Sequence, residues 1–99
     1  MMKFIKTNSQ VDLAENIVET PSQVVTHLVI PAGKVVPKHH VDYDVIVVPV
    51  KGKVIFGDVD NDHQETLVPG DIVKMTPGEW HDLQAVEDTE VMVIKSHLR

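Results

Sequence analysis

The stretch that decides the fold runs from residue 45 to residue 56 and reads Val45-Ile46-Val47-Val48-Pro49-Val50-Lys51-Gly52-Lys53-Val54-Ile55-Phe56. Two short apolar runs, rich in β-branched side chains, flank a Lys-Gly pair that is typical of a turn. Apolar runs this short favour strands over helices. The stretch therefore predicts two strands on either side of a turn.

The same pattern recurs along the chain. Further strands are expected at Val24–Ile30, Asp71–Met75 and Val91–Ile94, with turn residues rich in Pro, Gly and Asp between them. Many short strands separated by such turns predict an antiparallel sandwich or barrel. The segment Val11–Thr20 fits either a short helix or a strand with a turn.

Length and composition narrow the functional classes. Residues 1–99 are expected to form one domain around one core. The chain has no Cys, which excludes disulfides and thiolate nucleophiles. Its net charge of -6, with carboxylates scattered along the sequence, argues against a nucleic-acid partner. No stretch approaches the ~18 apolar residues of a membrane-spanning helix. We therefore expect a cytoplasmic protein without a membrane partner.

Four residues form a set of potential metal ligands or acid–base groups. They are His39, His40, Asp44 and His81, the last held after a Pro-Gly turn. Imidazoles together with a carboxylate suit a divalent transition metal such as Zn, Mn, Fe or Ni. The set predicts where a site lies but not which substrate enters it.

Two motifs of spaced glycines and histidines lie in the chain. The first is carried by Gly33, His39 and Gly52, and the second by Gly70, Gly78 and His81. This spacing resembles the cupin superfamily motifs G-x5-H-x-H-x(3,4)-E-x6-G and G-x5-P-x-G-x2-H-x3-N over about residues 28–95. The resemblance implies a small single-domain cupin, with a double-stranded β-helix (jelly-roll) barrel, and a homodimer.

The ligand positions depart from the family pattern. Val41 stands at the second His of the first motif and Val45 at its Glu, while Thr76 and Ala85 replace the Pro and Asn of the second. The resemblance therefore implies a metal site with fewer donors than the family offers, and weaker affinity.

Strand alternation leaves two registers open. In the first, His39 faces inward with Val41, Tyr43 and Val45, and only His39 and His81 reach the centre. In the second, the inward residues are His40, Asp42 and Asp44, and His40, Asp44 and His81 form a two-His-one-carboxylate set. The second register needs an extra residue before Gly52, for which Pro49 is a natural bulge position.

Three further side chains are candidates for lining the pocket. Trp80 could lie at its mouth, Tyr43 could present its hydroxyl, and His27 could approach the site from the strand Val24–Ile30. Each also has a plain structural interpretation as a packed or half-exposed residue. His63 and His97 are expected at the surface.

The sequence supports two functional hypotheses. The first is a small metal-binding cupin of unassigned activity that binds a small molecule in the barrel, and the second is a metal-free module that binds or senses a small molecule. A purely structural partner protein is a third, without positive support. Whether the protein is an enzyme stays open at this point.

Overall fold

The computed structural model describes residues 1–98 and confirms the expected all-β fold. Nine strands and no helix, hence no helix able to cross a membrane, are found in that part of the chain. The strands are β1 (Ala14–Glu19), β2 (Gln23–Ile30), β3 (Val35–His39), β4 (Asp44–Lys51), β5 (Val54–Asp58), β6 (His63–Leu67), β7 (Val73–Met75), β8 (His81–Ala85) and β9 (Thr89–Ser96).

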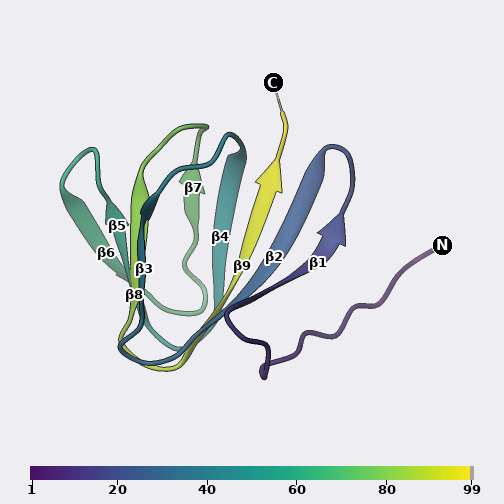
Figure 1. The fold of residues 1–99 in the computed structure, drawn as a ribbon, viewed down its shortest axis with the longest axis horizontal. Helices are drawn as coiled ribbons and strands as arrows, with labels where there is room; N and C mark the ends of the chain where they lie inside the picture. The colour runs from purple at the N-terminus through teal and green to yellow at the C-terminus, as the bar shows by residue number, and fades with distance from the viewer. Residues whose placement is uncertain (99) are drawn as a thin grey trace.

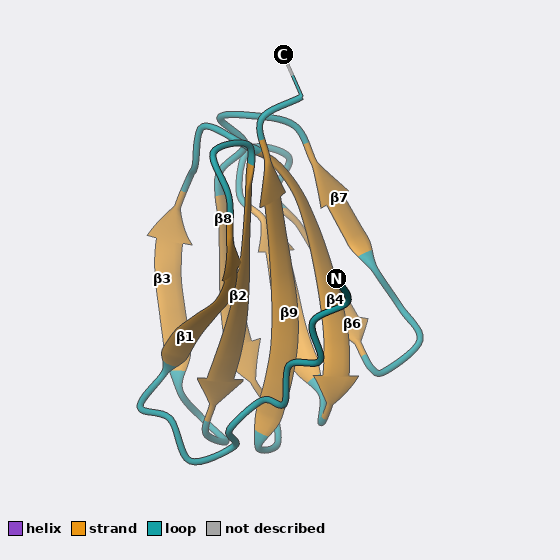
Figure 2. Ribbon diagram, turned by 90° about the vertical axis from the view of Figure 1, so that its right-hand side faces the viewer, coloured by secondary structure: helices purple, strands orange, loops and turns teal. Residues whose placement is uncertain are grey.

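The strands form two antiparallel sheets that face each other (Figure 1). One has the order β1-β2-β9-β4-β7 and the other β3-β8-β5-β6. Strand alternation turns one face of each sheet inward, where Val47, Val91, Val54 and Phe56 form part of the buried core. The N-terminal segment lies on the outer side of the first sheet and extends away from it (Figures 1 and 2).

The turn after β4 is anchored on the turn before β9. Gly52 has a φ of +85°, and a Cβ at this position would collide with the carbonyl oxygen of Asp88. The backbone N–H of Lys53 donates to Thr89 Oγ1 at 3.2 Å. A glycine is thus required at position 52 for two reasons, which are its left-handed backbone and its close approach to the Asp88 carbonyl.

Several elements differ from expectation. Val11–Thr20, left open between helix and strand, contains β1. The strand expected at Asp71–Met75 begins only at Val73, because Asp71 closes a turn by donating its N–H to the carbonyl of Val68 at 3.0 Å. Strands β3, β6 and β8 were not predicted.

Candidate functional site

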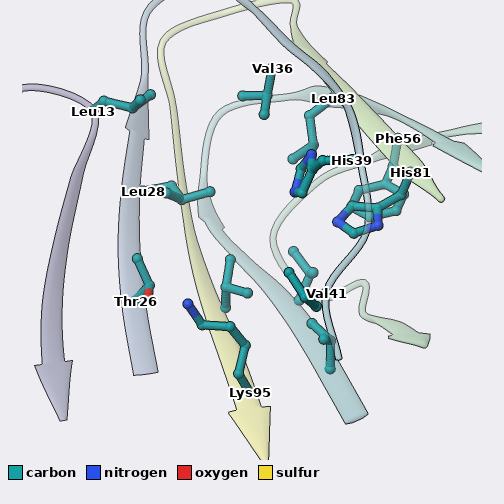
Figure 3. A pocket seen from close by; sticks show the side chains of 13 residues that line it. Leu13, Thr26, Leu28, Val36, His39, Val41, Phe56, His81, Leu83 and Lys95 are labelled. Carbon is teal, nitrogen blue, oxygen red and sulfur yellow. The ribbon is translucent and has the colours of Figure 1, made fainter. Parts of the chain in front are cut away.

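A cavity of about 170 Å³ lies between the sheets. It is lined by Leu13, Thr26, Leu28, Val36, His39, Val41, Val45, Val47, Phe56, His81, Leu83, Val93 and Lys95 (Figure 3). Most of these side chains are apolar. The polar groups are few and come from both sheets, as is usual for a small-molecule pocket.

His39 and His81 are cross-strand partners within this cavity. They are paired between β3 and β8, and their ring centroids lie 4.2 Å apart with the planes inclined by 58°. Cross-strand neighbours on one face of a sheet are the closest pairs that a sheet can make. The backbone pairing therefore holds the two imidazoles together.

A bulge in β3 turns His39 toward the cavity. Val36 pairs with Leu83 and His39 with His81, so three residue steps on β3 face two on β8. Without the extra residue, Val36 and His39 would point to opposite faces, yet both line the cavity. Pro37, which lacks an N–H, lies in the bulge, where a proline is tolerated.

The ring nitrogens of the two histidines have defined roles. Nδ1 of His39 lies 2.9 Å from the carbonyl oxygen of Pro37, and Nδ1 of His81 lies 3.0 Å from that of Glu79. Because a carbonyl only accepts, each Nδ1 must be the donor. In a neutral ring, Nε2 then carries a lone pair that can accept a proton or bind a metal.

Burial keeps the His81 ring neutral. His81 is 6% exposed, and its ring stacks on Phe56 with centroids 5.6 Å apart and planes at 3°. Desolvation lowers the pKa of His81, and this outweighs the hydrogen bond to the Glu79 carbonyl, which raises the pKa. Its Nε2 therefore stays an acceptor at a pH where an exposed histidine begins to protonate.

The structure has the first of the two registers. Val41, Val45 and Val47 line the cavity with His39, whereas His40 and Asp44 do not. His40 is exposed and meets Trp80 edge-on, with centroids 4.4 Å apart. The ladder between β4 and β9 does shift between Pro49 and Lys51, but this irregularity lies beyond Val45 and Val47 and leaves them facing inward.

Asp44 and Tyr43 lie apart from the histidine pair. Asp44 is paired with Ser96 on β9, and it precedes the inward Val45, so it belongs to the outer face. The Tyr43 ring packs on the His97 ring, with the ring centroids 4.2 Å apart, and Tyr43 does not line the cavity. The two-His-one-carboxylate set of the second register is therefore not brought together.

His27 is buried, but on the opposite face of β2. Its neighbours Thr26 and Leu28 line the cavity, so alternation turns His27 outward. There its Nδ1 lies 2.7 Å from Glu15 Oε2, and its Nε2 lies 2.7 Å from Glu90 Oε1. His27 thus joins β1, β2 and β9 rather than approaching the site.

Trp80 lines a second cavity rather than the first. This cavity measures about 310 Å³ and shares Phe56 and His81 with the first. The stacked pair therefore forms a wall between the two spaces. Trp80 is 39% exposed to solvent, so it lines the second cavity where that cavity opens to the protein surface.

Lys95 is the lining residue that the sequence analysis most clearly missed. It follows Val91 and Val93 at a period of two, and all three belong to the inward face of β9. Extending that alternation past the end of the apolar run would have placed its side chain in the cavity. It was missed because the expected strand ended with the apolar run Val91–Ile94, one residue before Lys95.

The cavity does not hold a complete set of metal ligands. In residues 1–98, no group of three or more His, Cys, Asp or Glu side chains is placed to hold a metal ion. The two imidazoles suit a transition metal by donor type, but no carboxylate or third imidazole lines the cavity with them. The residues present therefore do not fit the full metal site that the cupin resemblance implies.

Solved structures share this fold. A cupin family protein with a double-stranded β-helix fold from Methanocaldococcus jannaschii superposes with a TM-score of 0.81 at 23% identity, over 97% of this chain and 92% of that one. A cupin superfamily protein from Desulfitobacterium hafniense superposes with a TM-score of 0.79 at 14% identity, over 93% of this chain and 83% of that one. The predicted double-stranded β-helix is thereby confirmed.

Sequence comparison places the chain in a family. No curated protein matches it. The family model of the AraC-like ligand binding domain, however, matches residues 23–97, which include β2 to β9 and the histidine pair. This small cupin barrel therefore belongs to the AraC-like ligand binding domain family.

Proposed function

We propose that the protein binds a small molecule in the cavity between its sheets, with His39 and His81 as the polar anchor. The observation that carries this proposal is the orientation of the two imidazoles. Each Nδ1 is engaged by a backbone carbonyl, which leaves each Nε2 available in a space lined mainly by apolar side chains. Membership of a ligand-binding family supports it.

A fragment screen read by amide NMR tests the proposal. We expect bound fragments to shift the signals of cavity residues in the wild type. The His81→Ala and His39→Ala variants should bind the same fragments about tenfold more weakly, because a hydrogen bond to a buried group is worth about 1–1.5 kcal/mol. The His40→Ala variant is the matched control, since His40 is exposed outside the cavity. Binding that survives both cavity variants unchanged would contradict the proposal.

Metal binding is a second candidate function, favoured by the same Nδ1–carbonyl bonds. A histidine that ligates a metal usually donates its other ring N–H to such a group. With only His39 and His81 as donors, we expect weak binding of Zn, Mn, Fe or Ni that EDTA reverses without unfolding. Titration of the same four proteins with Zn(II) checks this, and zinc that resists EDTA dialysis would show a more complete site.

We also propose that two copies pair through the outer face of the five-stranded sheet. An apolar row crosses that face, because Val18 pairs with Val25, Val25 with Ile94 and Ile94 with Ile46. Ile46 is 38% exposed in the isolated chain. A continuous apolar row on a water-facing sheet is typical of a protein interface.

Light scattering should give about twice the 11.0 kDa chain mass. The Ile94→Lys variant should be monomeric at the same concentration, because it places a charge in the middle of the row. Val86→Lys is the control, since Val86 is an exposed apolar residue outside the sheet face. A wild-type monomer at micromolar concentration would refute the dimer alone.

A further inference from the structure

The cavity contains one fixed charge. Among its lining side chains only Lys95 is a cation, and no carboxylate lines the space. This is unexpected in a chain of net charge -6, in which acidic residues outnumber Lys and Arg by 15 to 9. The cavity is therefore an electropositive, largely apolar space in an acidic protein.

The strand pairing fixes the base of the Lys95 side chain on the inner face. Lys95 lies between Val24 on β2 and Val45 on β4, which flank it in the sheet. The side chain extends from β9 into the cavity (Figure 3). No carboxylate of residues 1–98 forms an ion pair with Lys95. An ammonium group in apolar surroundings gains most from an anion that approaches it.

Other donors near Lys95 are already engaged. Thr26 also lines the cavity, but its hydroxyl donates to Asn16 Oδ1 at 2.7 Å. The two imidazoles have their Nδ1 protons on backbone carbonyls. Lys95 is thus the lining side chain with free donor capacity for an anionic group.

We infer that the cavity takes a small organic anion, with its carboxylate on Lys95 and its apolar body among the valines and leucines. This rests on the proposed function and names its ligand class. A cavity of about 170 Å³ is close to the ~150 Å³ that holds a benzene ring in another protein. A sugar fits less well, because four polar side chains cannot satisfy its many hydroxyl groups.

Matched acid and amide probes test the inference at neutral pH. The pairs are benzoate with benzamide, and 4-methylpentanoate with its amide, measured by calorimetry and amide NMR. We expect each acid to bind the wild type more tightly than its amide. In Lys95→Met, the acid should lose about 10- to 100-fold in affinity, since hydrogen bonds to charged groups are worth about 1.5–3 kcal/mol. Amide binding should not change, which also reports that the cavity is intact.

Two control variants separate charge from structure. Lys95→Arg keeps the cation and should retain preference for the acid, and Lys34→Met removes an exposed lysine outside the cavity and should behave as wild type. Equal binding of acid and amide, or an unchanged acid affinity in Lys95→Met, overturns the anion inference and leaves the proposed function standing. If no probe of either charge shifts the cavity signals, both are overturned.

Discussion

Replacing His27 with Ala is expected to lower the free energy of unfolding by about 3 kcal/mol or more, which is the usual cost of removing one partner from a buried ion pair. His27 is fully buried between two carboxylates, with a 2.7 Å contact on each ring nitrogen. Its loss would leave Glu90, whose side chain is 11% exposed, with Lys51 at 3.9 Å as its remaining charged partner. Thermal or urea unfolding at neutral pH measures the effect.

The contacts of this cluster explain why the effect should be large. Each ring nitrogen of His27 lies 2.7 Å from a carboxylate oxygen, so removing the ring takes a hydrogen-bond partner from both Glu15 and Glu90. The backbone N–H of Asn8, and after it the His27 side chain, lower the pKa of Glu15. A lowered carboxyl pKa stabilises the fold above the unfolded-state pKa, and that contribution is lost as the pH falls through the folded-state value. Acid should therefore weaken the attachment of β1.

His63 provides the control for His27. Its Nε2 lies 3.3 Å from Glu65 Oε2, but both side chains are about two-thirds exposed. Exposed ion pairs contribute little, so His63→Ala should change stability by less than about 1 kcal/mol. Equal losses for the two variants would show that the buried cluster is not stabilising.

The Gly52→Ala variant is expected to lose about 2–5 kcal/mol of stability. Two costs add up. A left-handed backbone costs a non-glycine residue about 1–2 kcal/mol, and the added methyl group must displace the Asp88 carbonyl, for which overpacking costs about 1–3 kcal/mol. Urea unfolding measures the change in midpoint.

Gly33→Ala separates these two costs. Gly33 has nearly the same φ, +83°, but a Cβ there would meet nothing within 4 Å. It should therefore lose only the ~1–2 kcal/mol of backbone strain. A loss at Gly52 no larger than at Gly33 would mean that the turn shifts freely away from Asp88.

Much of the fold follows from local patterns in the sequence. The β-branched runs at β2, β4, β5 and β9 predicted strands because apolar residues on both faces of these strands make each run nearly continuous. Strand β6 (His63–Leu67) was not predicted because four of its five residues are exposed, so it carries no apolar alternation. Its pairing with β5 across the whole strand holds it in place instead.

The site was harder to predict than the strands. Sequence spacing left His39 and His40 as alternatives. Which of the two side chains points into the barrel depends on whether the strand contains a bulge, and spacing alone does not show a bulge. The decisive bulge lies on β3 next to Pro37, earlier in the chain than the expected Pro49 position. His27 was misplaced for a related reason, since its buried partners Glu15 and Glu90 are far from it in the sequence and only the sheet order brings them together.

The two sheets contribute different parts of the cavity. The four-stranded sheet holds the imidazoles of His39 and His81 in a fixed backbone register, whereas the five-stranded sheet supplies Lys95 and the facing valines. Substitutions on the five-stranded sheet can reshape the space or change its charge without moving the pair. The charge and shape of the ligand space can therefore be changed from one sheet, while the geometry of the imidazole pair is set by the backbone of the other.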